Sequence, residues 1–255
     1  MRVGLITAKP DHPLLSRTAA LLIERGHDIE QLPPTALSPA DPADVYLLKA
    51  RTPAAIALAR TLELRGIPVL NSAAATEFCQ DRTQMALRAD QAHLPFAGTV
   101  ALTALSCFDG HLDTPLVIKS RHSRRDDLVT RVSTPRELSE LIPRWAGEPV
   151  IIQDYVPGTG WDHKLWVVGD RVFAALRASE FGSGAGQPDI PQPQPHPWAE
   201  LARSVGKVFG LQIYGVDVLE VDGEPLIIDV NAFPGMRSVP GPPEALAELV
   251  ETHSP

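Results

Sequence analysis

Three oxygen-bearing side chains near the end of the chain form the group best suited to chemistry. Asp217 lies in an apolar stretch over residues 215–219, and Asp229 and Asn231 lie two residues apart in a second apolar stretch over 227–232. Side chains alternate along a strand, so Asp229 and Asn231 face the same way. Carboxylate and amide oxygens suit a hard cation such as Mg²⁺, which keeps water ligands and takes others from nucleotide phosphates. The spacing therefore predicts a cation site that serves phosphate chemistry.

The connection between these two stretches decides whether Asp217 joins the other two ligands. A two-residue turn at residues 222–223 would place Asp217 and Asp229 on opposite faces of the hairpin. We therefore predict a three-residue connection over residues 222–224, or a β-bulge that has the same effect. The alternative is an edge hairpin whose acidic side chains only face water.

Composition narrows the class of protein. The chain has 255 residues, of which 44% are hydrophobic and 21% charged, and this is ordinary for a globular protein. No apolar run approaches the roughly 20 residues that span a bilayer, and residues 1–7 are too short in apolar length for a signal peptide. Cys79 and Cys107 have neither metal-binding nor redox spacing, so the expected location is the cytoplasm. The net charge of −8 argues against a nucleic-acid binder, and no membrane partner is expected.

One segment departs from this acidic average. It holds six basic side chains and only two acidic ones, Asp126 and Asp127. The basic residues are Lys119, Arg121, His122, Arg124, Arg125 and Arg131. Such a cluster on an acidic protein indicates a place that binds anions, and the alternative is a solvated loop with local ion pairs.

The first third of the chain alternates strands with helices, which predicts a parallel sheet covered on both faces. No Gly-x-Gly-x-x-Gly motif is present there, so dinucleotide binding has no support. The expected strands are 2–7, 45–48 and 67–70, and the expected helices are 18–25 and 54–65.

The rest of the chain predicts a mixture of helices and short strands. A glycine- and proline-rich stretch over 179–198 excludes a helix or a central strand and is read as a functional or disordered loop. Helices are expected at 73–91 with Asp81 and Arg82 in the middle, after Pro135, at 199–209 and from Glu244, and strands at 97–102, 116–120, 128–132, 150–156, 164–168 and 171–177. The fold class is therefore α/β, built from α+β lobes.

These motifs in this order resemble the ATP-grasp superfamily over nearly the whole chain. The resemblance rests on Lys119 at the end of Val117-Ile118-Lys119, on residues 151–156, and on residues 215–217 together with 229–235. It implies two α+β lobes that grip ATP, with an N-terminal Rossmann-like lobe beside them. The corresponding segments are 1–75 for the N-terminal lobe, 76–150 for the central lobe and 151–255 for the C-terminal lobe with the metal site.

The resemblance also implies roles for single residues. Lys119 and Arg82 would contact the phosphates of ATP, Gln153 with the backbone of Asp154, Tyr155 and Val156 would hold the adenine, Asp162 would face the ribose, and Ser179 would lie at the nucleotide. Asp217, Asp229 and Asn231 would bind Mg²⁺, or Mn²⁺ in its place. Lys and Arg offset phosphate charge, so the set is chemically coherent.

The loop after Lys119 distinguishes branches of the superfamily. It runs over residues 120–127 without a glycine, whereas ligases of the peptide and glutamate type usually have a glycine-rich loop there. It looks more like the inositol 1,3,4-trisphosphate 5/6-kinase branch, as do 163–169, 177–179, 213–217 and 228–235. In that branch His122 and Lys164 would hold substrate phosphates and the backbone at Gly235 would lie against the substrate. Arg121, Arg124, Arg125 and Arg237 would supply further charge, since the N-terminal lobe shows no basic patch beyond Arg2 and Lys9.

Three hypotheses follow, with Lys119, Lys164 and Arg177 as the catalytic candidates. The first is a Mg-ATP-dependent phosphotransferase acting on a hydroxyl of a small anionic acceptor, such as a polyol phosphate. The alternative is a carboxylate–amine ligase that works through an acyl phosphate, in which Arg177 would stabilise the acyl-phosphate and tetrahedral species. The third is an ATP-binding protein without catalysis. Dimers are common among the proteins that this chain resembles, but its sequence does not show its oligomeric state.

Overall fold

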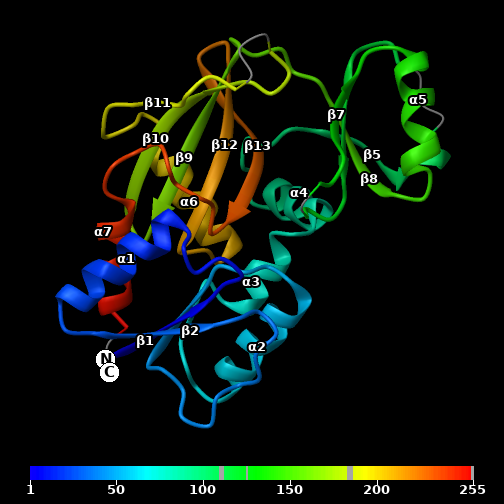
Figure 1. The fold of residues 1–255 in the computed structure, drawn as a ribbon. Coiled ribbons are helices and arrows are strands. Elements are labelled where there is room, and N and C mark those ends of the chain that lie inside the picture. The colour runs from blue at the N-terminus through cyan, green and yellow to red at the C-terminus, as the bar shows by residue number, and fades with distance from the viewer. Residues whose placement is uncertain (109–111, 125, 183–185, 254–255) are drawn as a thin grey trace.

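The computed structural model describes residues 1–108, 112–124, 126–182 and 186–253, and it has three β-sheets with helices packed against them (Figure 1). Each sheet comes from one segment of the chain, in the order N-terminal, middle and C-terminal. The predicted α/β class with several lobes is therefore confirmed. Within the described ranges, every helix is too short or too polar to cross a lipid bilayer.

The N-terminal sheet is parallel, with strand order β2-β1-β3-β4. Helix α1 packs on the face that holds Val3 and Leu5, and α2 packs on the other face with Ile6 and Tyr46. From β1 the chain adds β2 on one side of the sheet and then β3 and β4 on the other side. The position between β1 and β3 is therefore the switch point of a doubly wound sheet. The elements are β1 (Arg2–Ile6), α1 (Pro13–Glu24), β2 (Asp28–Leu32), β3 (Val45–Leu48), α2 (Pro53–Leu64) and β4 (Val69–Leu70).

Local residue choices explain where these helices begin. Pro13 and Pro53 occupy the first turn of α1 and α2, and the Thr52 side chain accepts a hydrogen bond from the backbone N–H of Ala55. Helix α1 thus begins five residues earlier than the predicted start at 18. Strand β2 was not predicted, because no residue in it is fully buried and its hydrophobic pattern is weak.

The middle segment folds into an antiparallel sheet of order β5-β8-β6-β7 with α5 on one side. The single helix predicted over 73–91 is wrong: it is two helices, because the Asp81 side chain accepts hydrogen bonds from the N–H groups of Thr83 and Gln84 and starts a new helix at Arg82. The elements are α3 (Ala73–Phe78), α4 (Arg82–Gln91), β5 (Thr99–Ala104), the 3₁₀ turn η1 (Leu105–Cys107), β6 (Leu116–Ser120), β7 (Val129–Val132), α5 (Pro135–Trp145) and β8 (Pro149–Asp154).

The C-terminal segment forms an antiparallel sheet of order β11-β10-β9-β12-β13. Its two-residue edge strand β11 is the one element within the described part of 179–198, so the prediction that this stretch holds no central strand is confirmed. Gly184 of that stretch lies outside the described residues. The elements are β9 (Trp161–Val168), β10 (Arg171–Ala178), β11 (Ile190–Pro191), α6 (Ala199–Phe209), β12 (Ile213–Val221), β13 (Glu224–Ala232) and α7 (Pro242–Glu251).

The hairpin of β12 and β13 settles the question of which faces its acids share. Val221 pairs directly with Glu224, so the connection is a two-residue turn and the predicted three-residue connection is wrong. A register shift between Asp217 and Val218 supplies the β-bulge that was the other option. Asp217 consequently lies directly opposite Asp229. The bulge prediction is confirmed, and it is what brings the two carboxylates to one face.

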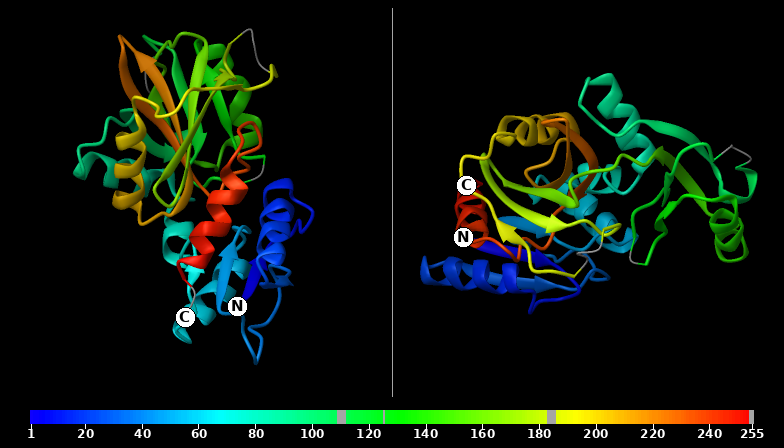
Figure 2. Two further views of the ribbon diagram at one scale, coloured as in Figure 1. Left: turned by 90° about the vertical axis from the view of Figure 1, so that its left-hand side faces the viewer. Right: turned by 90° about the horizontal axis from the view of Figure 1, so that it is seen from above.

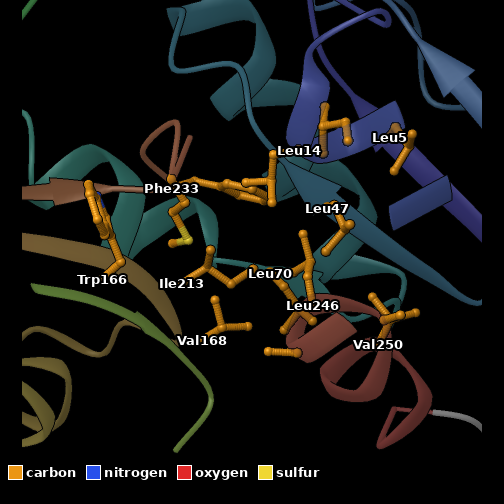
Figure 3. Packing of buried hydrophobic residues seen from close by; sticks show 14 of the residues in the cluster. Leu5, Leu14, Leu47, Leu70, Trp166, Val168, Ile213, Phe233, Leu246 and Val250 are labelled. Atoms are coloured by element: carbon orange, nitrogen blue, oxygen red, sulfur yellow. The ribbon is translucent and has the colours of Figure 1, made fainter. Parts of the chain in front are cut away.

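A shared hydrophobic core joins the N-terminal sheet to the C-terminal sheet (Figure 3). Leu5, Leu14 and Leu47 pack in one cluster with Trp166 and Phe233, and the helices α1 and α7 lie side by side beneath them. The middle sheet has a core of its own and projects to one side, as Figures 1 and 2 show. The end of α7 lies close to the start of β2, since His27 contacts Glu251 over 3.2 Å.

A buried asparagine also ties these two sheets together. The Oδ1 atom of Asn71 accepts hydrogen bonds from the N–H groups of Gln212 and Ile213, and its amide donates to the carbonyl of Ile213. Helices α3 and α4 follow Asn71 and pack on the C-terminal sheet rather than in the core of the middle sheet. The boundary between the central and C-terminal lobes was predicted between residues 150 and 151, and both residues lie within strand β8. The predicted lobe boundaries remain a prediction.

Candidate active site

A cavity of about 590 Å³ lies between the middle sheet and the C-terminal sheet. Strands β6, β8, β9, β12 and β13 all contribute side chains to it. We call it the first cavity. It brings together most of the residues that the sequence proposed for the nucleotide and the metal: Arg82, Lys119, Gln153, Asp154, Tyr155, Val156, Asp162, Lys164, Arg177, Ser179, Asp217, Asp229 and Asn231.

The three predicted metal ligands meet at one end of the first cavity. Asp217 and Asp229 are cross-strand partners, and the amide of Asn231 donates to Oδ2 of Asp229 over 3.3 Å, which leaves the Asn231 carbonyl oxygen free to face a ligand. Burial, together with the nearby Asp229 carboxylate, raises the pKa of Asp217. A divalent cation would relieve both effects, so the donor set fits Mg²⁺. Among the described residues no group of three or more His, Cys, Asp or Glu side chains is placed to hold a metal, so the Asn231 oxygen is needed as a third ligand.

Two buried cations face these carboxylates. The Lys119 amine donates to the carbonyl of Ile228 over 2.8 Å, and its burial lowers its pKa. Arg82 donates to Asp127 over 2.7 Å, and its other guanidinium nitrogen lies 3.8 Å from Asp229. Both line the first cavity, as the sequence proposed for phosphate-binding residues.

The edge of β8 supplies the other wall of the first cavity. The Gln153 amide is buried and donates to the carbonyl of Ala97 over 3.0 Å. The Tyr155 ring packs against Arg131, whose guanidinium lies 4.2 Å from the ring centre, and edge-on against Phe181. An apolar slot with backbone groups at its edge is the kind of surface that takes a flat purine.

Lys164 stands at the centre of the site and is held by two carboxylates. Its amine lies 3.0 Å from Asp217 and 3.4 Å from Asp162. Burial works against the charged amine, but these carboxylates outweigh it and raise the pKa of Lys164. Arg177 is fixed in a similar way by two parallel hydrogen bonds to Asp189, of 2.9 and 2.8 Å.

The loop after Lys119 contributes Ser123 and Asp127 to the first cavity, but its basic side chains Arg121, His122 and Arg124 do not line it. Arg121 forms a forked ion pair with Asp81, Arg124 pairs with Glu148 over 2.7 Å, and His122 bridges to the backbone of Asp81. Neither these arginines nor His122 line the first cavity. The prediction that Arg121, Arg124 and His122 gather at the substrate is therefore not met, because local carboxylates hold the two arginines elsewhere. Arg125 lies outside the described residues.

A second cavity of about 430 Å³ adjoins the first. Lys164, Arg177, Asp217 and Asn231 line both cavities. The remaining wall comes from β9 and β12, from the segment after β13, and from residues that follow β1 and β3. Its residues are His12, Lys49, Trp166, Gly215, Pro234, Gly235, Met236, Arg237 and Ser238. The structure thus brings the predicted substrate residues Lys164, Gly235 and Arg237 together here.

Sequence reasoning missed two residues of this second cavity, His12 and Lys49. Instead it considered Arg2, which lies at the other end of β1 and pairs with Asp41 and Glu30, and Lys9, which does not line the second cavity. A signal was present, because Lys49 comes directly after strand β3 and residues 7–12 follow β1. Ligands of open parallel sheets bind at the carboxyl ends of the strands.

The fold and the site together define a protein of the ATP-grasp class: two α+β units with a cavity between them, lined by phosphate-binding cations and a carboxylate hairpin. Residues 102–241, more than half of the chain, match the model of the RimK-like ATP-grasp domain, and the chain belongs to this family. The resemblance to the ATP-grasp superfamily is therefore confirmed.

The curated relatives carry ligase names. A probable alpha-L-glutamate ligase of Ectopseudomonas mendocina (strain ymp) is 30% identical over 135 residues, which cover 49% of this chain and 44% of that protein. A probable alpha-L-glutamate ligase 2 of Shewanella amazonensis (strain ATCC BAA-1098 / SB2B) is 31% identical over 137 residues, with the same coverage. The match thus spans less than half the length of each relative. Of the two branches named from the sequence, the glutamate-ligase type, which was the second choice, is the one these relatives represent.

Solved structures agree on the fold. The RimK domain ATP-grasp protein of Sphaerobacter thermophilus DSM 20745 superposes with a TM-score of 0.77 at 23% identity, covering 98% of this chain and all of that one. The D-alanine–D-alanine ligase of Bacillus anthracis gives 0.71 at 19% identity, covering 99% and 96%. The ATP-grasp ligase PsnB, solved with a variant of its minimal precursor, Mg and ADP, gives 0.70 at 18% identity, covering 99% and 98%.

Proposed function

We propose that this protein is a Mg-ATP-dependent carboxylate–amine ligase that works through an acyl phosphate. The observation that carries the proposal is that two cavities meet at Lys164, Arg177, Asp217 and Asn231. A nucleotide in the first cavity and an acceptor in the second would have their reacting ends at this junction. Holding two reactants in contact is the largest part of what such a site must do.

The first cavity suits ATP. Lys119 and Arg82 lie where they would offset phosphate charge, and the 153–156 edge lies where it would hold the adenine. The Oδ1 atom of Asp162 is buried and has no hydrogen-bond partner among the described residues, so it would accept from a ribose hydroxyl. These assignments keep the roles that the sequence suggested.

Asp217, Asp229 and Asn231 would hold the Mg²⁺ that accompanies ATP. Bound there, the ion would offset the charge of the phosphates and polarise them. Lys164 holds Asp217 through its ion pair, so the ligand is fixed before the ion arrives.

The chemistry at the junction takes two steps. A carboxylate oxygen of the acceptor attacks the γ-phosphorus, a new O–P bond forms, the bond to the β-phosphate oxygen breaks, and ADP leaves. An amine then attacks the acyl carbon, loses a proton, and expels inorganic phosphate as the C–O bond breaks. Arg177 and Lys164 would orient the carboxylate first and then stabilise the oxyanion of the tetrahedral species.

The comparisons favour this ligase over the phosphotransferase that the sequence placed first. The relatives are named glutamate ligases, and Arg121 and Arg124, on which the kinase hypothesis depended, form their ion pairs outside both cavities. Glutamate is accordingly the first compound to test, both as the carboxylate and as the amine.

Hydroxylamine trapping tests the proposal. The protein is incubated with Mg-ATP, hydroxylamine and a panel of carboxylates that includes glutamate, and hydroxamate and ADP are measured. We expect hydroxamate in amounts equal to ADP, because an acyl phosphate reacts with hydroxylamine. ADP with the phosphate retained on a hydroxyl of the acceptor would restore the kinase hypothesis, and Mg-ATP binding with no turnover would indicate a binding protein.

A further inference from the structure

The second cavity holds positive charge that no carboxylate balances. His12, Lys49 and Arg237 all line it, and within the described ranges none of the three has an acidic side chain at ion-pair distance. The cations shared with or near the first cavity differ, because Lys164, Arg177 and Arg82 each have a carboxylate partner. In the first cavity Lys119 donates to a backbone carbonyl and forms no ion pair, so among the described residues it is in the second cavity that several basic groups without a carboxylate partner gather.

These three groups are brought together by the topology of two lobes. Lys49 follows β3 and His12 follows β1, so both lie at the carboxyl ends of neighbouring parallel strands, at the switch point of the N-terminal sheet. Arg237 comes from the segment after β13 in the other sheet. The Lys49 amine reaches that segment and donates to the carbonyl of Phe233 over 2.6 Å.

The surroundings of Lys49 and His12 disfavour positive charge on both side chains. Burial, then Arg51 and Arg237, lowers the pKa of Lys49 to about 8. Burial, then Lys49 and Arg237, lowers the pKa of His12. His12 is 91% buried, since its exposed fraction is 9%, and its Nδ1 atom has no hydrogen-bond partner among the described residues. An anion between these groups would offset the repulsion and supply the missing contacts.

We propose that the second cavity binds an acceptor with two anionic groups, a small dicarboxylate, whose far carboxylate is held by Lys49, His12 and Arg237. The near carboxylate would lie at Lys164 and Arg177 and receive the phosphoryl group. This inference rests on the proposed ligase function for its near end only. The positive wall also disfavours a compound with a net positive charge in this cavity.

A matched pair of compounds tests the far contact. Glutarate and its monomethyl ester have the same carboxylate to activate and differ in the second charge. Hydroxamate formation is measured for both with the wild-type protein and with Lys49→Met, Arg237→Gln and the control Lys207→Met, an exposed lysine on α6. Arg237 is exposed, so its substitution leaves the core intact if Lys49→Met does not fold.

We expect wild type to prefer glutarate, and Lys49→Met and Arg237→Gln each to lower kcat/KM for glutarate about 10- to 100-fold, the range of one charge-assisted hydrogen bond. The ester should change less than about threefold by the same arithmetic, and the control should match wild type. Equal losses for both compounds, or no preference in wild type, would overturn the inference. Replacing the far carboxylate by a phosphate tests the second source of negative charge: a phosphorylated acceptor preferred over glutarate would overturn the dicarboxylate assignment.

Calorimetry of glutarate and its ester without ATP separates this inference from the proposed function. Glutarate binding that weakens in Lys49→Met and in Arg237→Gln supports the dianion site, even if no carboxylate yields hydroxamate and the ligase proposal fails. The opposite outcome is that both compounds give hydroxamate, bind with equal affinity, and bind the variants as tightly as wild type. The ligase proposal would then stand and the dianion site would be overturned.

Discussion

The two adjoining cavities treat positive charge in opposite ways. In the first, Arg82 pairs with Asp127 and Lys164 with Asp217, so these two cations are balanced by acidic groups of the protein itself. In the second, Lys49 and Arg237 have no acidic partner among the described residues. Burial, then Arg51 and Arg237, lowers the pKa of Lys49 to about 8. The fold holds the first set in place without a ligand, whereas the second set leaves a charge for a ligand to offset.

A segment rich in basic residues need not be a site that binds anions. The loop over 120–127 is rich in arginine, yet Arg121 and Arg124 are bound to Asp81 and Glu148. Lys49 is a single lysine after a strand and carries no such sequence signal. Whether a cation is available to an anion depends on its neighbours in space more than on the density of charge along the chain.

The largest effect is expected from removing a metal ligand. Asp229→Ala should lower kcat/KM at least about 1,000-fold, which corresponds to about 4 kcal/mol, because the Mg²⁺ that Asp229 is proposed to hold would lose a ligand. Thermal unfolding should change little, since this change also relieves the repulsion between Asp229 and Asp217. Glu224→Ala, at the exposed turn of the same hairpin, is the control. Wild-type turnover in Asp229→Ala would remove the hairpin from the active site.

The next largest effect is a pH dependence of KM for the acceptor, which the second cavity is proposed to bind. Lys49 carries its charge below a pKa of about 8 and loses it above, so KM for glutarate should rise up to about tenfold per pH unit above 8. The pKa of Lys164 is raised, so Lys164 keeps its charge over the same range and its effect on KM stays constant. Measured from pH 6.5 to about 9.5, the rise should be absent in Lys49→Met.

The titration of Lys49 also predicts the direction in which the free energy of unfolding changes with pH. Between a pKa of about 8 in the folded protein and 10.5 in the unfolded chain, the unfolded chain binds more protons at Lys49. The free energy of unfolding without substrate should therefore rise with pH across this window, and less so in Lys49→Met. A fall across the window in both proteins would contradict the assignment of Lys49 as an unbalanced cation.

A smaller effect should come from filling space in one cavity at a time. A methyl group at Gly235 would lie 3.7 Å from His12 Nε2 and 3.7 Å from Arg237 Nε, so Gly235→Ala should raise KM for the acceptor about threefold and leave KM for ATP unchanged. Gly158→Ala, in the first cavity, should do the reverse. Steady-state kinetics with either substrate varied checks both, and a change in the same KM for both variants would show that the cavities are not separate.

The smallest effect is expected in the basic loop. Arg121→Gln and Arg124→Gln should change kcat/KM less than about threefold, and each should cost at most about 1 kcal/mol of stability, as exposed ion pairs do. Chemical denaturation and ADP release measure the two quantities. A loss of activity beyond tenfold in either variant would return the acceptor to this loop.

The sequence predicted the parts of the site that depend on local periodicity. Strand alternation placed Asp229 and Asn231 on one face, and a parity argument required either a longer turn or a bulge. The choice between the two was out of reach, because a bulge depends on how β12 also pairs with β9. The break at Asp81 was readable from its helix-capping residue type, but the prediction of one helix over 73–91 did not use that signal.

The parts that sequence could not predict depend on contacts between distant segments. The partner of Arg121 is 40 residues away, and Lys49 meets Phe233 across 184 residues. The end of a strand indicates that a ligand site is near, but only the docking of the two sheets through their shared core brings His12 to Gly235. The overall fold therefore followed from patterns and motifs, whereas the acceptor end of the site required the structure.

Oxygen transfer tests the central claim most directly, namely that phosphate passes to a carboxylate at the junction of the two cavities. An acceptor carboxylate labelled with ¹⁸O, such as glutamate, is turned over with unlabelled Mg-ATP and an amine, and the released phosphate is analysed by mass. The account predicts one ¹⁸O atom in each phosphate, because the carboxylate oxygen that attacks phosphorus leaves with it. Unlabelled phosphate, or phosphate that stays on a hydroxyl of the acceptor, would contradict it.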